Sequence, residues 1–305
     1  MIDVTGLTKS YGDRTVVDSL SFQARPGVVT GFLGPNGAGK STTMRMIMGL
    51  DRPTSGSATV NGRDYRTLTA PMHEIGALLD AKSLYGPRRA ADHLWCLARA
   101  NGIGQRRVAD VLDMVGLRDA ARRRAGSFSL GMGQRLGLAA ALLGDPPVLM
   151  LDEPVNGLDP EGIIWMRTLL KTLAAEGRTV LLSSHLMSEM EHTADHLVVI
   201  GQGRLIADMS VQGLIDTSSR TCVRVRATEP ERLSAFLAHT GAGVDQAPDG
   251  LLSVTGLDTG QVSDIAARNG IALRELAAPR SSLEEAYLEL TQHTTDYSTT
   301  APAAA

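Results

Sequence analysis

Residues 34–42 carry the residue types and the spacing of a phosphate-binding loop. The segment fits the pattern G-x-x-x-x-G-K-[ST], and it lies between an apolar run at 28–33 and a stretch at 40–50 with helical spacing. Glycines in such a loop let backbone N–H groups surround phosphate oxygens, and the helix that follows presents its positive end. The predicted nucleotide-binding residues are Gly34, Pro35, Asn36, Gly37, Ala38, Gly39, Lys40, Ser41 and Thr42.

Three of these side chains have distinct predicted tasks. Lys40 supplies positive charge to the β and γ phosphates, the Ser41 hydroxyl ligates Mg²⁺, and Thr42 reaches the α-phosphate. The alternative is a glycine-rich turn with an exposed lysine. The neighbouring strand and helix favour the binding of a nucleotide together with Mg²⁺.

Two adjacent carboxylates follow an apolar strand expected at residues 148–151. A buried parallel strand delivers the residues at its carboxyl end to the crevice where ligands bind. There Asp152 can hold Mg²⁺, and Glu153 can orient and deprotonate a water in line with the γ-phosphate. Alone, this pattern often marks a strand that meets solvent. Downstream of a phosphate loop it indicates hydrolysis.

The elements that position these residues form an α/β pattern. Strands are expected at 2–8, 16–23, 28–33, 56–61 and 74–79, helical segments between 89 and 117, and then strands at 148–151, 179–183, 196–200 and 204–208 with helices at 160–175 and 186–192. Apolar strands that alternate with helices predict a parallel sheet covered on both faces. We therefore expect one domain over residues 1–210.

The pattern changes after residue 210. Strands at 222–227, 244–246, 251–255 and 271–275 alternate with helices at 230–240, 260–269 and 282–291, which predicts a small ferredoxin-like α+β domain over 211–291. Residues 292–305 are rich in Thr, Ala and Pro and are expected to be a disordered tail.

Composition excludes several classes of protein. The net charge is −3 over 305 residues, which argues against a nucleic-acid partner. The two cysteines, Cys96 and Cys222, provide neither a disulfide framework nor a metal spacing, and Cys96 is expected to be buried. No secretory signal or membrane-spanning segment is expected.

Further motifs resemble the ATP-binding subunits of ABC transporters. Residues 128–135, Phe-Ser-Leu-Gly-Met-Gly-Gln-Arg, are similar to the family signature L-S-G-G-Q, residues 154–160 to its D-loop, and residues 182–185 to its switch histidine segment. Tyr11 stands where the family places an aromatic ring on adenine. The resemblance covers about residues 2–210 and implies a P-loop NTPase fold with a parallel-sheet core, an antiparallel β subdomain and a helical subdomain.

The resemblance also implies a shared site between two copies of the chain. Ser129 and the Gly131 amide would face a γ-phosphate held by the other copy, and His185 would contact the γ-phosphate of its own. The implied catalytic residues are Glu153, His185 and Lys40. Taken by itself, Ser129 is an N-cap of the following helix, and Asp159 with Pro160 is another helix start.

Two departures from the family pattern point to a subgroup. Leu130 and Met132 alter the signature, and Asp80 stands where the family has a glutamine that contacts Mg²⁺ or water. These changes, with the segment 281–290, resemble bacterial ABC-2 type subunits of drug and antibiotic efflux, such as the daunorubicin- and bacitracin-resistance systems. Asp80 is accordingly predicted as a metal-site residue beside Ser41 and Asp152.

The resemblance implies an ATPase at the cytoplasmic face of a membrane, working as a dimer on a separately encoded polytopic permease, with export as the favoured direction. An importer or a lipid- or polysaccharide-exporting ATPase is an alternative. A soluble ABC ATPase acting on ribosomes or DNA is another, although one set of motifs and no basic surplus argue against it. A P-loop kinase or regulator leaves residues 129–133 and His185 without a role.

Overall fold

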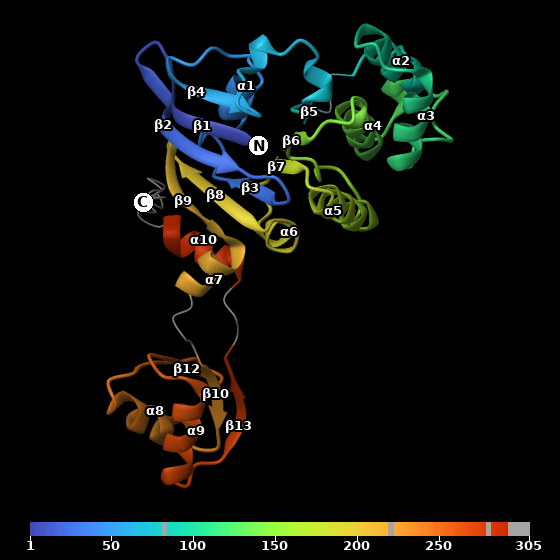
Figure 1. Ribbon diagram of the computed structural model, residues 1–305. Coiled ribbons are helices and arrows are strands. Elements are labelled where there is room, and N and C mark those ends of the chain that lie inside the picture. Colours follow the sequence, from blue (N-terminus) through green and yellow to red (C-terminus); the bar gives the residue numbers. More distant parts are fainter. Residues whose placement is uncertain (81–83, 219–222, 279–281, 292–305) are drawn as a thin grey trace, which may run out of the picture. The chain divides into compact units, whose positions relative to one another are not determined.

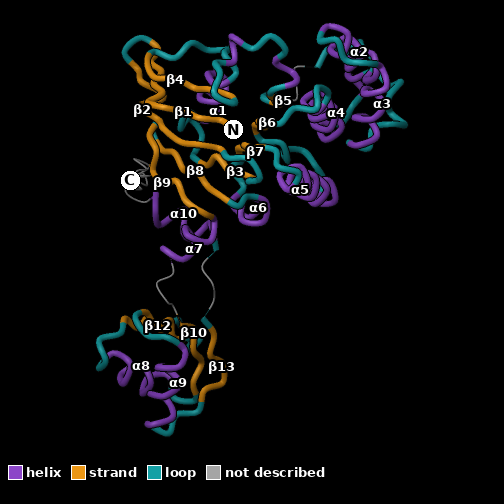
Figure 2. The backbone as a smooth tube through the Cα atoms, in the orientation of Figure 1, coloured by secondary structure: helices purple, strands orange, loops and turns teal. Residues whose placement is uncertain are grey.

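The computed structural model describes residues 1–80, 84–218, 223–278 and 282–291 (Figure 1). The chain divides into two compact units, of which one comprises Met1–Val211 and the other Gln212–Leu290. The tail predicted at 292–305 lies outside the described residues. The elements of each unit are shown by type in Figure 2.

A six-stranded sheet forms the centre of the first unit. Its strands, in spatial order, are β5 (Ile75–Leu78), β6 (Val148–Asp152), β7 (Thr179–Ser183), β3 (Val29–Leu33), β8 (His196–Gly201) and β9 (Arg204–Ser210). Neighbouring strands are parallel from β5 to β8, as the sequence predicts. β9 is antiparallel to β8, because a two-residue turn with positive φ at Gln202 and Gly203 joins them as a hairpin.

A second, antiparallel sheet packs over the first helix. It consists of β2 (Arg14–Ala24), β1 (Ile2–Tyr11) and β4 (Ser55–Val60), in that order. The helix α1 (Lys40–Ile47) lies between the two sheets, and its buried side chains Met44 and Ile47 share one apolar core with Leu7 and Leu20 of the small sheet and Met150 of the large one. This packing holds the amino end of α1 rigidly against the central sheet.

The remaining helices of this unit fall into two groups (Figure 1). α2 (Ala90–Ala100), α3 (Gln105–Met114) and α4 (Leu130–Leu142) form the helical subdomain, and α4 packs against β5. α5 (Pro160–Ala175) and α6 (Met187–Thr193) cover the face of the central sheet opposite α1, where Met190 lies against Gly31 of β3. Short 3₁₀ turns complete the unit at Tyr65–Thr67, Pro71–His73 and Ala125–Ser127.

The second unit has the ferredoxin-like topology that the sequence predicts. Its elements are α7 (Val211–Ser218), β10 (Val223–Ala227), α8 (Pro230–Ala238), β11 (Gly243–Gln246), β12 (Leu252–Thr255), α9 (Thr259–Arg268), β13 (Leu273–Ala277) and α10 (Leu283–Thr291). The strands pair antiparallel in the order β11-β12-β10-β13. Apolar side chains of β10 and β12 share a core with α8 and α9. α7 was not predicted, because Gly213 weakens the helical pattern of a short segment.

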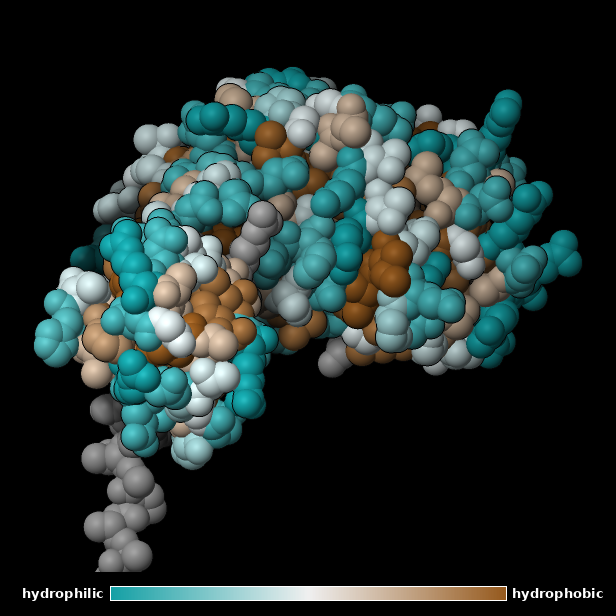
Figure 3. Space-filling view, turned by 90° about the horizontal axis from the view of Figure 1, so that it is seen from below, coloured by the Kyte–Doolittle hydropathy of each residue, from teal (hydrophilic) through white to brown (hydrophobic). Residues whose placement is uncertain are grey.

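Two surface features bear on the expectations from sequence. Cys96 is exposed on α2, so the prediction that it is buried was wrong: the buried positions of that helix are Ala90, Leu94 and Ala98, and Cys96 lies off their stripe. Among the described residues, no helix is long and apolar enough to cross a membrane. On the face that Figure 3 presents, hydrophobic side chains form small patches separated by hydrophilic ones.

Candidate functional site

The order of the central strands brings the predicted site residues together. β6, β7 and β3 are neighbours and run parallel, so their carboxyl ends lie at one edge of the sheet. The phosphate loop follows β3, the two carboxylates end β6, and the segment with His185 follows β7. A cavity of about 250 Å³ lies at this edge, lined by Val16, Asn36, Gly37, Gly39, Lys40, Ser41, Thr42, Asp152 and Glu153.

The phosphate loop requires its glycines for two physical reasons. Gly37 and Gly39 have φ values of 81° and 103°, which side chains other than glycine rarely allow. A Cβ atom on Gly34 would lie 2.5 Å from the carbonyl oxygen of Ile200, and one on Gly39 would lie 2.8 Å from that of Val16. The loop is therefore wedged between β8 and β2, in a fixed shape at the amino end of α1.

Lys40 is held inside this loop. Its side chain is 7% exposed, and Nζ donates to the carbonyl oxygens of Gly34 at 2.6 Å and Pro35 at 3.2 Å. Burial lowers the pKa of Lys40, while the nearby carboxylates of Glu153 and Asp152 oppose that shift. A phosphate that enters the cavity would meet a lysine already aimed into the loop.

Asp152 accepts two hydroxyl hydrogen bonds. Ser41 Oγ donates to Oδ2 at 2.8 Å, and Ser183 Oγ donates to Oδ1. Mg²⁺ prefers oxygen ligands and keeps several waters, so it needs few protein groups. The hydroxyl of Ser41 and the carboxylate of Asp152, adjacent at the mouth of the loop, fit such an ion.

Glu153 lies directly beyond the strand with its carboxylate turned toward His185. Nδ1 of His185 is 2.8 Å from Oε2 of Glu153, and because an ionised carboxylate only accepts, this nitrogen carries the proton in the contact. His185 is half exposed and the Glu153 side chain is 22% exposed. Glu153 lines the phosphate cavity, where a water could be oriented, whereas His185 does not line it and is connected to it through Glu153.

Ser183 supports both carboxylate residues and was not predicted as a site residue. Its hydroxyl donates to Asp152 and accepts the backbone N–H of Glu153 at 3.0 Å. The sequence did contain an indication, because a serine that ends a buried strand beside the acidic strand faces the same crevice.

Replacing Ser183 with alanine should lower kcat for ATP about 10- to 150-fold and leave KM nearly unchanged. The change removes one charge-assisted hydrogen bond to Asp152 and one restraint on Glu153, which together are worth about 1.5–3 kcal/mol. Steady-state phosphate release measures both constants. Ser188→Ala, at an exposed position of α6, is the matched control, and an unchanged kcat in Ser183→Ala would contradict this role.

Asp80 lies outside the phosphate cavity. It follows β5 and borders a neighbouring cavity of about 720 Å³, whose lining also includes Ser41 and Asp152. The same cavity reaches Leu84 and His93, toward the helical subdomain. Asp80 therefore shares this cavity with two predicted metal ligands and with a residue of α2.

The signature residues face a different cavity. Ser129 caps α4, its Oγ accepting the N–H of Met132 at 3.3 Å, so the expected N-cap is confirmed. With Leu130 and Gly133 it lines a cavity of about 240 Å³. A Cβ atom on Gly131 would lie 2.8 Å from the Gly157 carbonyl oxygen, so the signature and the D-loop segment touch. Within one chain, Ser129 and Gly131 do not border the phosphate cavity.

Tyr11 ends β1 and is also outside the phosphate cavity. It is 51% exposed, its hydroxyl donates to Asp51 at 3.4 Å, and Lys9 Nζ lies 4.8 Å from the ring centroid. The face of the ring has a cation beside it and solvent around it. Val16, on the adjacent strand, lines the phosphate cavity instead.

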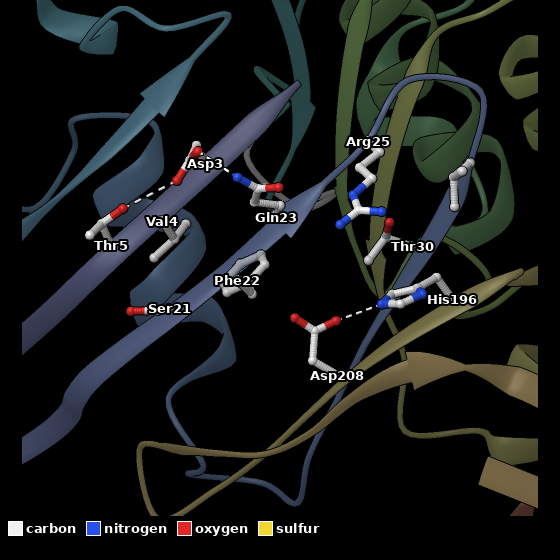
Figure 4. A pocket seen from close by; sticks show the side chains of 11 residues that line it. Asp3, Val4, Thr5, Ser21, Phe22, Gln23, Arg25, Thr30, His196 and Asp208 are labelled. Atoms are coloured by element: carbon white, nitrogen blue, oxygen red, sulfur yellow. Dashed lines mark hydrogen bonds and ion pairs between the residues drawn. The ribbon is translucent and has the colours of Figure 1, made fainter. Parts of the chain in front are cut away.

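A cavity of about 400 Å³ lies at the opposite end of the central sheet (Figure 4). Thr30 and His196 border it from the early parts of β3 and β8, whereas the phosphate loop follows the end of β3. His196 Nε2 lies 2.5 Å from Oδ1 of Asp208, and Gln23 donates to Asp3 at 2.9 Å. The two cavities share no lining residue, so this one is separate from the nucleotide site, and its polar groups bind one another.

Comparison with protein families assigns the two units separately. Residues 17–156 match the family model described as "ABC transporter", and residues 221–284 match one described as "Domain of unknown function (DUF8746)". The first match contains the phosphate loop, the signature segment and both carboxylates. The second falls on the ferredoxin-like unit.

Individual relatives match over most of the chain. The "Bacitracin transport ATP-binding protein BcrA" of Bacillus licheniformis is 35% identical over 297 residues, or 95% of this chain and 97% of the relative. The "Lantibiotic transport ATP-binding protein SrtF" of Streptococcus pyogenes is 38% identical over 213 residues, or 70% and 92%. The "Nod factor export ATP-binding protein I" of a Rhizobium species is 35% identical over 298 residues, or 95% and 96%.

Solved structures agree on the fold. A structure titled "Structure of ATP binding subunit of ABC transporter" has a TM-score of 0.65 at 28% identity, covering 71% of this chain and 92% of that one. The dimeric bacterial cassette MJ0796 has a TM-score of 0.64 at 24% identity, covering 69% and 98%, which supports the fold alone. Together with the whole-length relatives, these matches show that the chain belongs to the family of ABC transporter ATP-binding proteins.

Proposed function

We propose that this ATP-hydrolysing subunit drives the export of an antibiotic or related compound through a separate membrane protein of the ABC-2 type. The observation that carries the proposal is the whole-length similarity to the bacitracin transport ATP-binding protein, because it extends over both compact units. The Nod factor export relative is similar over the same extent, which supports export as the direction.

Two copies of the chain would enclose two ATP molecules. Lys40 faces the phosphate cavity, whereas Ser129 and Gly131 do not border it within one chain. A second copy, placed head to tail, would supply these groups to the γ-phosphate. The nucleotide would then hold two protomers together, and ADP, which lacks that phosphate, would release them.

Hydrolysis would use the groups at the carboxyl end of β6 and β7. Glu153 accepts a proton from the attacking water, while the protonated Nδ1 of His185 donates to the carboxylate and restrains its orientation. Lys40 stabilises negative charge on the γ-phosphate as the bond to the β-phosphate breaks. Ser41 and Asp152 would hold Mg²⁺, which when bound neutralises charge on the β and γ phosphates.

The subunit would act at the cytoplasmic face of the membrane, held there by its permease. Asp80 borders the cavity that contains Ser41 and Asp152 and extends to His93 in the helical subdomain. We therefore assign residues 80–94 to the transmission of motion from the nucleotide to the permease. A carboxylate at position 80 would contact Mg²⁺ or its waters in place of an amide.

The proposal is tested by sequencing the neighbouring reading frames and expressing the chain, together with any polytopic membrane protein that they encode, in a bacitracin-sensitive host. Resistance to bacitracin or a lantibiotic should appear only when both proteins are present and Glu153 is intact. Membrane vesicles should then transport the same compound in an ATP-dependent way.

Two outcomes would contradict this proposal. Co-purification with ribosomes instead of a membrane protein would favour a soluble ABC ATPase, and ATP-dependent uptake instead of extrusion would reverse the direction. Loss of transport with retained ATP hydrolysis, on separating the two proteins, would agree with a motor that needs its permease.

A further inference from the structure

The backbone of Glu153 has a conformation that non-glycine residues seldom adopt. Its φ is +51°, in the left-handed region, so the surrounding groups must hold it there. The N–H donates to Ser183 Oγ at 3.0 Å and to the Ser183 carbonyl oxygen at 3.2 Å. The Glu153 carbonyl accepts from the Asn156 N–H at 3.2 Å and from Nε2 of Gln134 at 3.2 Å. The orientation of the Glu153 carboxylate, the proposed general base, depends on these contacts.

The contact with Gln134 is made by another subdomain. Gln134 lies on α4, five residues after the Ser129 N-cap of the same helix, and it is 5% exposed. Its Oε1 is buried and has no hydrogen-bond partner within the described part of the chain. The side chain thus gives up one hydrogen bond in the interior, a cost that a purely apolar residue would avoid. What the amide does provide is a donor to the Glu153 carbonyl.

A helix moves as a rigid body over so short a distance. A displacement of Ser129 and Gly131 at the start of α4 therefore also displaces Gln134, less than two turns along. Because Gln134 is bonded to the Glu153 peptide, that displacement changes the aim of the carboxylate. A shift of about 1 Å in a catalytic group can change a rate about 100-fold.

We propose that Gln134 is a positioning residue that couples the two nucleotide sites of the dimer. The partner's ATP determines the position of α4. Through Gln134, the position of α4 in turn determines the orientation of Glu153, the general base that acts on the protomer's own ATP. This inference rests on the proposed function, since it needs the shared site and Glu153 as base. It predicts that ATP hydrolysis at the two sites is coordinated, because Glu153 of each protomer is correctly oriented only when the other site holds ATP.

The experiment uses dimers in which only one protomer has an intact Glu153, and it places the Gln134 substitution either in that protomer or in its partner. Gln134→Met keeps the length and removes the donor, and Gln134→Asn keeps the amide but withdraws it from the carbonyl. In the first mixture, the Gln134 variant with intact Glu153 is paired with a large excess of Glu153→Gln. In the second, the unmodified chain is paired with a large excess of a double variant that carries the Gln134 substitution and Glu153→Gln. The reference is the unmodified chain with excess Glu153→Gln.

The expected result is asymmetric. The first mixture should hydrolyse ATP about 10- to 100-fold more slowly than the reference, with an unchanged KM, because the altered residue and the working base share a chain. The second mixture should match the reference, because its working base keeps its own Gln134. Thr179→Val, which removes a buried hydroxyl that, like Gln134 Oε1, has no hydrogen-bond partner among the described residues, should behave as the unmodified chain in either arrangement.

Equal loss in both mixtures, or loss only in the second, would overturn the inference, since a general packing defect or an effect through Ser129 would act in that way. Rates equal to that of the reference, in both mixtures and for both substitutions, would overturn it too. If size-exclusion chromatography shows that ATP does not pair the reference protomers at all, the proposal of a shared nucleotide site is wrong. The inference about Gln134, which depends on that site, is then wrong as well.

Discussion

Replacing Glu153 with glutamine is expected to lower ATP turnover about 100- to 10,000-fold while ATP binding is retained. The amide has nearly the same shape as the carboxylate, but it does not take a proton from the attacking water. The change also removes one negative charge near Lys40 and the phosphate cavity, so nucleotide affinity should stay the same or rise. Phosphate release measures turnover, and a fluorescent ATP analogue measures binding.

The same variant should form an ATP-dependent dimer, because the nucleotide that holds two protomers together is no longer consumed. Glu231→Gln, at an exposed position of α8 in the other unit, is the matched control and should leave turnover unchanged. Wild-type turnover in Glu153→Gln would remove this residue as the base. Retained ATP with no dimer, in the presence of the permease, would instead contradict the shared site.

Replacing Lys40 with methionine is expected to weaken ATP binding about 10- to 100-fold and to abolish measurable turnover. The Nζ group donates to the Gly34 and Pro35 carbonyls and faces the phosphate cavity, and hydrogen bonds to a charged group contribute about 1.5–3 kcal/mol. Methionine fills a similar volume, so the fold should persist. Isothermal titration with ATP and with ADP measures the loss, which should be larger for ATP.

Lys171 is a suitable control for this experiment, because it is an exposed lysine on α5. Lys171→Met should bind ATP with unchanged affinity. An ATP affinity in Lys40→Met equal to that of the control would show that the lysine does not contact phosphate, and the loop would then bind nucleotide through its backbone alone.

The local pattern of the sequence determined most elements of the fold. α5 and β7 begin and end where the sequence predicts them, at residues 160–175 and 179–183, because Asp159 caps the helix, Pro160 starts it, and Gly177 with its positive φ ends it. The phosphate loop could also be predicted from its local sequence, because its glycines satisfy steric limits that act within a few residues. The two units and the antiparallel sheet of the second follow from a change in strand and helix order at residue 210.

Contacts between distant segments were decided only by the tertiary structure. Ser183 binds Asp152 across 31 residues, and Gln134 binds Glu153 across 19, because the order of the strands and the docking of α4 place them together. A pattern of spacing encodes neighbours along one helix or strand, but it carries no record of which buried polar atom a partner segment will reach. The sequence therefore predicted which residues could do the chemistry, whereas the packing of β6, β7 and α4 decided which distant side chains contact them.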